Sequence, residues 1–298
     1  MLSVIPAFIL FPIHFIFQII NLACCALLIT LLGLIKLLLP FGLVAAALTP
    51  VMHFLMFAFG VVSVKMIRLT NKVDWQCEID SQLNKNHWYL MMANHLSYLD
   101  IILLIDFAAK RIPAPKFFLK KELIWLPFVG LGAWALDMPF MRRYSREYVE
   151  KNPHLKGKDI ETTRKSCRKF QRTPTTVINF VEGSRYTAEK HQKKASPYRY
   201  LLPPRAGGVA FTLAAMGELF TNILNVTILY PDNTKHPMMD MLSGKLTKVI
   251  VHVDVLPVSE QVVGDYFNDE TFKTNFQLWL NDVWLQKDKL IAQLVGNK

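Results

Sequence analysis

The hydrophobic pattern of the chain begins with two long apolar stretches that carry almost no charge. In residues 1–64 the only formally charged side chain is Lys36. The continuous part of the first stretch, residues 15–35, has the roughly 20 apolar residues that a membrane-spanning helix needs. A break that contains Pro40 precedes the second stretch, residues 43–64. We therefore expect an N-terminal membrane-associated hairpin of two apolar helices.

Basic residues at the end of this hairpin predict its orientation. Lys65, Arg68 and Lys72 follow the second apolar stretch, and such clusters mark the cytoplasmic side of a membrane helix. The first stretch lacks the basic start of a secretory signal peptide, which argues against cleavage. The pattern leaves open whether the hairpin crosses the bilayer or enters only one leaflet.

Beyond the hairpin, short β-rich runs alternate with helical stretches. Residues 74–86 are polar, so we expect two domains, the hairpin in residues 1–72 and a second domain in residues 73–298. Strands are predicted at residues 88–93, 116–119, 175–181, 226–230 and 249–255. Helices are predicted at residues 97–109, 158–171, 207–216 and 272–295. This alternation is typical of an α/β domain with a mostly parallel sheet flanked by helices.

The last predicted helix carries large apolar residues near helical spacing, namely Phe272, Phe276, Trp279, Leu280, Val283 and Trp284. This spacing predicts a face that packs against the sheet. Docking of its tryptophans to a membrane is the alternative interpretation.

Charge narrows the class of partner. The net charge is +11, and residues 142–172 hold eleven Lys or Arg against four Asp or Glu, a local charge of +7. Such a basic stretch suits an anionic membrane surface, a phosphate-bearing substrate or an acidic carrier protein. Its aromatic and basic residues are not interleaved as in single-strand binders, so nucleic acid is not expected as a partner. A solvated basic helix face is the remaining interpretation.

A histidine and a carboxylate stand between two apolar runs, in Asn94-His95-Leu96-Ser97-Tyr98-Leu99-Asp100. An imidazole can take a proton near neutral pH, and a carboxylate on its other nitrogen fixes the tautomer and stabilises the imidazolium. The pair therefore predicts a general base whose attacking hydroxyl belongs to the substrate. Taken alone, the spacing also fits a structural His95 beside a helix-capping Asp100.

No metal or cofactor site is expected. The four cysteines, Cys24, Cys25, Cys77 and Cys167, lack metal-ligand spacing and fit a reduced, cytosol-facing protein. No nucleotide fingerprint and no Gly-x-Ser-x-Gly nucleophile motif occurs in the chain.

Four blocks in the right order resemble the glycerolipid acyltransferases, the PlsC-like or 1-acyl-sn-glycerol-3-phosphate acyltransferase family. Asn-His-x-x-x-x-Asp at residues 94–100 resembles the first block, and residues 118–143 resemble the second. Phe180-Val181-Glu182-Gly183-Ser184-Arg185 resembles the third block, and Val226-Thr227-Ile228-Leu229-Tyr230-Pro231 the fourth. The resemblance covers about residues 85–232, and it implies the glycerolipid acyltransferase fold.

The resemblance also implies a reaction. In this family a substrate hydroxyl attacks an acyl thioester, with His95 as general base and Asp100 as the residue that orients it. The acyl donor, acyl-CoA or acyl carrier protein, is a co-substrate, and no further cofactor is implied. For the developing oxyanion, Lys120 or the backbone N–H of Gly183 is the expected donor.

Arginines are expected to bind the phosphate of a lysophospholipid acceptor, because their planar fork matches phosphate oxygens. Arg143 and Arg185 match the arginines of the family's second and third blocks. Glu182 is expected to orient the acceptor or to hold an arginine, and Gly183 to let the backbone approach the substrate. Arg205 is expected to add to the phosphate site.

The chain departs from the family pattern in places that leave the reaction intact. Val181 replaces the usual proline of the third block and Ser184 the usual threonine. The longer segment at residues 186–200, together with Leu-Pro-Pro-Arg at residues 202–205 and the fourth block, is similar to the lysocardiolipin-type branch. The chain is closer still to the YihG-type branch of bacterial inner-membrane members, which resembles nearly the whole catalytic domain. This similarity implies a location in the bacterial inner membrane, and the basic residues after the hairpin predict that the catalytic domain, residues 73–298, faces the cytoplasm.

The sequence therefore predicts a membrane-bound O-acyltransferase that esterifies the sn-2 hydroxyl of 1-acyl-glycerol-3-phosphate and makes phosphatidic acid. One alternative is a remodelling acyltransferase that acts on another lysophospholipid. A second alternative is a non-catalytic membrane protein that binds anionic lipid. Membrane lipids are partners in all three cases.

Overall fold

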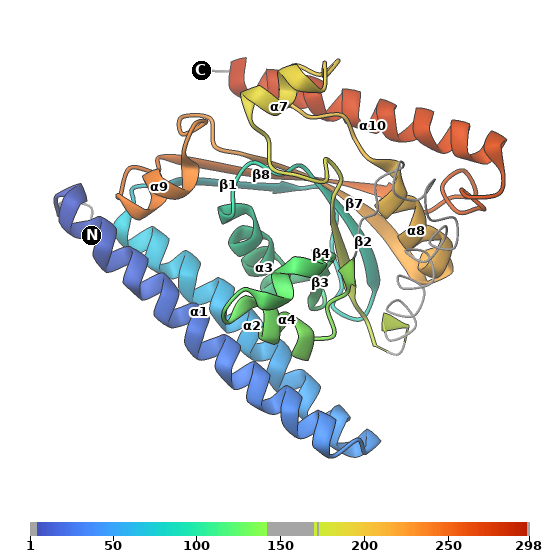
Figure 1. The fold of residues 1–298 in the computed structure, drawn as a ribbon. Coiled ribbons are helices and arrows are strands. Elements are labelled where there is room, and N and C mark those ends of the chain that lie inside the picture. Colours follow the sequence, from blue (N-terminus) through green and yellow to red (C-terminus); the bar gives the residue numbers. More distant parts are fainter. Residues whose placement is uncertain (1–4, 142–169, 172, 297–298) are drawn as a thin grey trace.

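The computed structural model describes residues 5–141, 170–171 and 173–296, and a six-stranded sheet lies at its centre (Figure 1). The strands stand in the order β1-β8-β7-β2-β6-β3, and every neighbouring pair is parallel except β7 with β8. Their bounds are β1 Asp74–Ile79, β2 Trp88–Ala93, β3 Pro115–Phe117, β6 Thr176–Phe180, β7 Phe220–Leu229 and β8 Lys248–Pro257. The predicted α/β domain with a mostly parallel sheet is confirmed.

The central strand β2 shows why the sheet is covered on both faces. Its side chains are almost all buried, as in a strand that lies inside a parallel sheet. Tyr89, Met91 and Ala93 belong to one apolar cluster, whereas Leu90 and Met92 belong to another. Because successive side chains of a strand point to opposite faces, the two clusters lie on opposite sides of the sheet.

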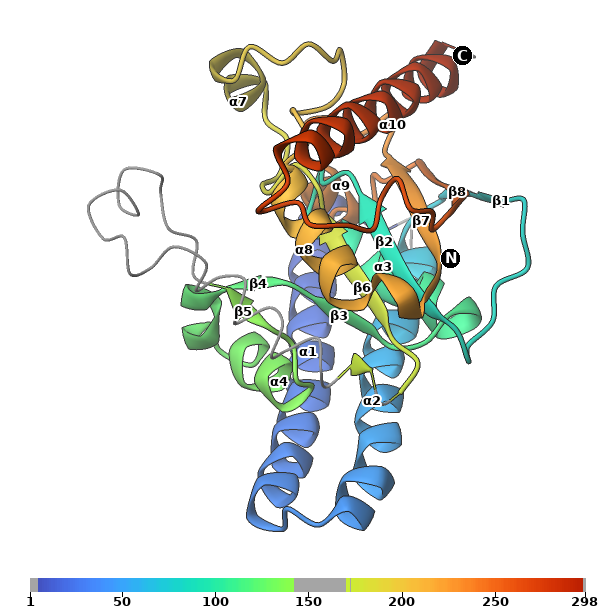
Figure 2. The same cartoon turned by 90° about the vertical axis from the view of Figure 1, so that its right-hand side faces the viewer.

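Different helices cover the two faces. The first cluster includes residues of the N-terminal helices α1 (Ala7–Leu38) and α2 (Gly42–Thr70) and of α3 (Leu99–Arg111). The second includes residues of α8 (Ala206–Met216) and α10 (Glu270–Gly296). Figures 1 and 2 show the hairpin and α10 on opposite sides of the sheet. Phe276, Leu280 and Trp284 of α10 are completely buried, which confirms the predicted packing face.

The helices α1 and α2 run side by side as an antiparallel hairpin (Figure 2). Both are long and apolar enough to cross a membrane, by length and composition, and few of their apolar residues are buried. Polar contacts join them within the hairpin, since the Asn21 amide donates to the Ser63 hydroxyl over 3.0 Å. Both helices are longer than predicted, because α1 begins at Ala7 and remains helical through Pro12, and α2 continues to Thr70.

The hairpin packs against the α/β domain along its length. Near its start α1 contacts α9 (Pro237–Leu242), and further along it packs on α4 (Val129–Ala135). Near the far end of α1, Lys36 forms an ion pair of 2.7 Å with Asp137. The second helix, α2, packs on α3. The α/β domain therefore contacts α1 over much of its length, and the tip of the hairpin extends beyond α4 (Figure 2).

Several short elements were not predicted. Residues 74–79 were read as a polar boundary, but they form β1, which pairs with β8 at the edge of the sheet and is only partly buried. A two-stranded sheet joins β4 (Leu119–Lys120) to β5 (Phe140–Met141). The short helices are η2 Lys121–Trp125, α4, α7 Ala188–Lys193, η4 Gly217–Leu219 and α9. The predicted helix at residues 158–171 lies almost wholly outside the described residues.

Candidate active site

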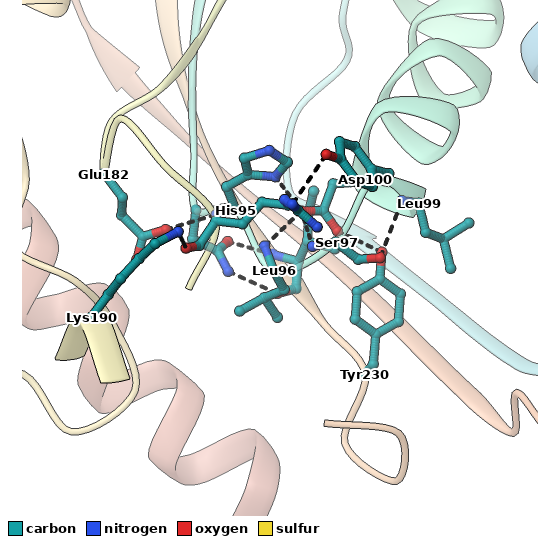
Figure 3. Close-up of polar contacts among 12 residues, drawn as sticks. His95, Leu96, Ser97, Leu99, Asp100, Glu182, Lys190 and Tyr230 are labelled. Carbon is teal, nitrogen blue, oxygen red and sulfur yellow. Dashed lines mark hydrogen bonds and ion pairs between the residues drawn. The ribbon is translucent and has the colours of Figure 1, made fainter. Parts of the chain in front are cut away.

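His95 and Asp100 meet at the end of β2, where the chain turns into α3 (Figure 3). One oxygen of Asp100, Oδ2, lies 2.8 Å from His95 Nδ1. The same oxygen accepts the backbone N–H groups of Leu96 and Ser97, over 2.7 and 2.9 Å. The buried carboxylate therefore orders the loop and holds the imidazole together.

The other oxygen of Asp100 accepts the hydroxyl of Tyr230 over 2.6 Å. Burial, followed by the charge of Asp100 and this hydrogen bond, raises the pKa of Tyr230 well above its usual value, so the tyrosine stays a donor. A carboxylate that receives donors on both oxygens is an acceptor only. His95 Nδ1 must therefore carry a hydrogen, and Nε2 is left with the lone pair that a general base needs.

The imidazole of His95 is held on a further side by an aromatic ring. The rings of His95 and Phe180 stack with their centroids 4.0 Å apart. The His95 side chain remains 13% exposed, so a substrate hydroxyl can reach it. Asn94, the preceding residue, is fixed to β7, where it accepts from the Ile228 N–H and donates to the Ile228 carbonyl.

Glu182 supports the same loop from the next strand of the sheet. It is completely buried, and its two oxygens accept the backbone N–H groups of His95 (2.9 Å) and Leu202 (2.8 Å). Burial raises the pKa of Glu182 to about 7, and the two N–H donors and the charge of Lys287 limit this rise. Glu182 was expected to orient the acceptor or to hold an arginine. In this structure its carboxylate binds the backbone of two separate segments, at His95 and at Leu202.

Gly183 closes a tight turn after β6. Its φ of +69° lies in the left-handed region that favours glycine. Its N–H donates to the Phe180 carbonyl over 2.9 Å. This donor is engaged within the turn in this structure, and its role towards an oxyanion stays a prediction.

Arg185 lies at the edge of the site, beside the loop that carries His95. Its guanidinium donates to the Tyr98 hydroxyl over 3.1 Å and lies 3.8 Å from the centroid of the Tyr98 ring. Lys190 of α7 contacts the backbone of Arg185, since its ammonium group donates to the Arg185 carbonyl over 3.0 Å. The charges of Lys190, Arg205 and Glu182 all act on Lys194, so basic groups gather on this side of Glu182.

Two other predicted site residues, Lys120 and Arg205, are exposed. Lys120 is exposed in β4, which belongs to the separate two-stranded sheet. Arg205 is exposed at the start of α8, where its N–H donates to the Val181 carbonyl. Arg143 lies outside the described residues. Among the residues that the structure describes, no group of three or more metal-ligating side chains is found.

Two residues of the site were missed in the sequence, Tyr230 and Lys287. Tyr230 stood in the fourth block without a role, because nothing in the sequence shows that it meets a residue 130 positions away. Lys287 had a signal, since it continues the apolar face of the last helix after Phe276, Leu280 and Trp284.

Comparison with known proteins places this site in a family. A family model described as Acyltransferase matches residues 74–230. The chain belongs to the acyltransferase family. The matched residues include His95, Asp100, Glu182, Arg185 and Tyr230, whereas the hairpin and α10 lie outside them.

Individual relatives are distant. The chain is 25% identical over 221 residues to an uncharacterized acyltransferase of Schizosaccharomyces pombe, a match that covers 69% of this chain and 59% of the relative. It is 24% identical over 179 residues to the mouse 1-acyl-sn-glycerol-3-phosphate acyltransferase delta, covering 57% of this chain and 42% of the relative. The chain thus spans about half the length of the curated relatives it matches.

A solved structure shares the fold. The 1-acyl-sn-glycerophosphate (LPA) acyltransferase PlsC from Thermotoga maritima superposes with a TM-score of 0.52 at 16% sequence identity. The match covers 89% of this chain and 95% of that protein. The likeness extends beyond the residues of the family model and includes most of this acyltransferase chain.

Proposed function

We propose that this member of the family is a membrane-bound O-acyltransferase that transfers an acyl chain from acyl-CoA or acyl carrier protein to the sn-2 hydroxyl of 1-acyl-glycerol-3-phosphate, giving phosphatidic acid. The observation that carries the proposal is the chain of contacts from Tyr230 through Asp100 to His95, which leaves His95 Nε2 as the acceptor of a proton. The names of the relatives support the choice of substrate.

In the proposed step, His95 Nε2 takes the proton of the acceptor hydroxyl as its oxygen attacks the thioester carbonyl. The resulting imidazolium is stabilised by the Asp100 carboxylate on Nδ1. Collapse of the tetrahedral intermediate breaks the carbon–sulfur bond, and the leaving thiolate takes the proton from His95. The products are an ester and a free thiol, and His95 returns to its starting state.

The basic groups next to the site support an anionic acceptor. Arg185 lies beside the His95 loop, and Lys190 and Lys194 extend the positive charge away from it. We assign Arg185 to the acceptor phosphate and retain Arg143 and Arg205 as further members of that site. We also propose that this chain is of the YihG type and lies in the bacterial inner membrane, with its catalytic domain facing the cytoplasm.

The hairpin is proposed to be the membrane anchor, and its contacts favour entry into one leaflet. The α/β domain contacts α1 near its first turns, through α9, and again near its last turn, through the ion pair between Lys36 and Asp137. If the hairpin crossed the bilayer, α4 and Asp137, which contact the far part of α1, would have to cross it as well. The anchor then holds the site at the interface where acceptor and product reside.

The test is acyl transfer by the purified full-length protein. Lysophosphatidic acid and other lysophospholipids are offered as acceptors, each with acyl-CoA and with acyl carrier protein. Ester formation that is fastest with lysophosphatidic acid is the expected result. Preference for another lysophospholipid would assign the protein to phospholipid remodelling instead of phosphatidic acid synthesis. Hydrolysis of the acyl donor without an acceptor would contradict the proposal.

A further inference from the structure

Three polar or charged residues of α10 lie on the face that enters the core. Trp284, Lys287 and Asp288 stand at positions i, i+3 and i+4, so they share one side of the helix. They are 0%, 1% and 9% exposed. Lysine and aspartate are almost never fully buried unless they are paired, so these two need a structural or functional reason. None of the three lies in the family-matched residues 74–230.

Two of these residues hold the segment that follows α7. The indole N–H of Trp284 donates to the Leu202 carbonyl over 3.0 Å, and the N–H of Leu202 donates to Glu182 over 2.8 Å. The Asp288 carboxylate accepts the backbone N–H groups of Arg199 and Tyr200, over 2.9 and 2.8 Å. The C-terminal helix is thus connected to Glu182 through one residue.

Lys287 places a buried positive charge at β7, the strand next to β2, which leads to the proposed base. Its ammonium group donates to the Val226 carbonyl over 2.5 Å and lies 4.7 Å from the centroid of the Trp284 ring. Val226 pairs in register with Ala93, the last residue of β2. Two residues later the His95 N–H donates to Glu182, whose charge acts on Lys287.

We propose that Lys287 is a positioning residue, which keeps the Glu182 carboxylate ionised so that both of its oxygens accept, one from His95 and one from Leu202. Its effect on catalysis rests on the proposed function. An ionised carboxylate accepts with two oxygens, whereas a protonated carboxyl uses one oxygen as a donor. Loss of the charge would free one of the two N–H groups, and the loop that carries His95 would lose a support.

The electrostatics of the pair agree with this role. Burial raises the pKa of Glu182 to about 7 and lowers the pKa of Lys287 to about 7, and in each case the charge of the other group limits the shift. Other groups from the surrounding elements act on the pair: Asp100 of α3 disfavours ionised Glu182, Asp254 of β8 favours charged Lys287, and Tyr186 and Lys194 sense Glu182. A carboxyl that titrates near neutral pH responds to the loss of one nearby cation.

The first experiment is hydrogen–deuterium exchange of the wild-type protein as a function of pH. After correction for intrinsic rates, the amides of His95 and Leu202 should exchange faster as the pH falls through about 7. In Lys287→Met this acceleration should already be present at pH 7 to 8, whereas Lys289→Met, which changes an exposed lysine of the same helix, should match wild type. Wild-type protection that is independent of pH would overturn the proposal.

Transfer rates supply the second experiment. Lys287→Met should shift the rising limb of the rate–pH profile to higher pH, and each unit of that shift lowers the rate about tenfold at a pH below the limb. Lys287→Arg should restore most of the rate. In a Glu182→Gln background, Lys287→Met should have little further effect. An equal loss in both backgrounds would show that Lys287 acts only through packing and would overturn the proposal.

The two experiments separate this proposal from the proposed function. A wild-type protein that transfers no acyl group would refute the function, yet the exchange measurements would still test whether Lys287 controls the ionisation of Glu182. An active wild-type protein with unchanged exchange in Lys287→Met would refute only the role of Lys287.

Discussion

Replacing Tyr230 by phenylalanine removes one hydroxyl from the centre of the site. That hydroxyl donates to Asp100 over 2.6 Å, and both residues are buried, with 2% and 0% of their surface exposed. Water therefore cannot take the place of the lost donor without rearrangement. A hydrogen bond to a charged group contributes about 1.5–3 kcal/mol, so we expect Tyr230→Phe to lower the free energy of unfolding by about that amount.

Transfer activity should fall as well, because Asp100 Oδ1 would lose its donor and the carboxylate that positions His95 would be held less firmly. If about 1.4 kcal/mol of the lost interaction appears in the transition state, kcat/KM falls about tenfold. This loss is smaller than the ~10²–10⁴ expected when a general base is removed. The phenylalanine ring of the variant would fill the same space as the tyrosine ring, so the sheet should stay intact.

Tyr89→Phe is a matched control. Tyr89 is also a buried tyrosine, but its hydroxyl accepts a neutral backbone N–H from Asn84. We expect a smaller loss of about 0.5–1.5 kcal/mol and unchanged transfer. Both variants are compared by denaturant unfolding in detergent and by kcat/KM. Equal stability and activity of Tyr230→Phe and wild type would refute the inferred link between Tyr230, Asp100 and His95.

Three further predictions concern the buried carboxylate and the hairpin. Because burial raises the pKa of Glu182 from its ordinary 4.5 to about 7, the folded state binds this proton more tightly than the unfolded state, and stability should fall by about 3 kcal/mol as the pH rises between these values. Unfolding measured over that range should lose this slope in Glu182→Gln, and an unchanged slope would assign it to another group. A Cβ added at Gly33 would lie 2.4 Å from the Ala135 Cβ, so Gly33→Ala should cost about 1–3 kcal/mol in thermal or denaturant unfolding, whereas Gly42→Ala, which meets open space, should not destabilise. Phe41→Cys, at the tip of the hairpin and in a chain whose four native cysteines are replaced, should resist an impermeant maleimide added on the side opposite the catalytic domain. Labelling from that side would show that the hairpin crosses the bilayer.

The elements that the sequence predicted well are those with a strong apolar signal. The run at residues 88–93 became β2, and the last helix buries the face that its spacing indicated. The strand β1 was missed because an edge strand is only partly buried, so its polar pattern resembles a linker. The first helix was expected only after Pro12, in residues 15–35, yet helical backbone begins at Ala7 and continues through that proline.

The site was predictable where its residues are close in sequence. His95 and Asp100 are five positions apart, and a single loop brings them together. The contacts of Tyr230 and Lys287 depend on the order of the strands and on where α10 crosses the sheet, which local patterns do not contain. The surroundings of Glu182 illustrate the same limit, because two backbone amides from separate segments occupy its oxygens.

The central claim is that His95 is the base of an acyl transfer, and one comparison tests it most directly. Purified wild type, His95→Ala and His87→Ala are assayed for ester formation from acyl-CoA and lysophosphatidic acid. His87 is exposed just before the opposite end of β2, so its loss controls for the removal of a histidine. We predict that His95→Ala lowers kcat/KM by ~10²–10⁴ and that His87→Ala matches wild type. Transfer by His95→Ala at the wild-type rate would contradict the account.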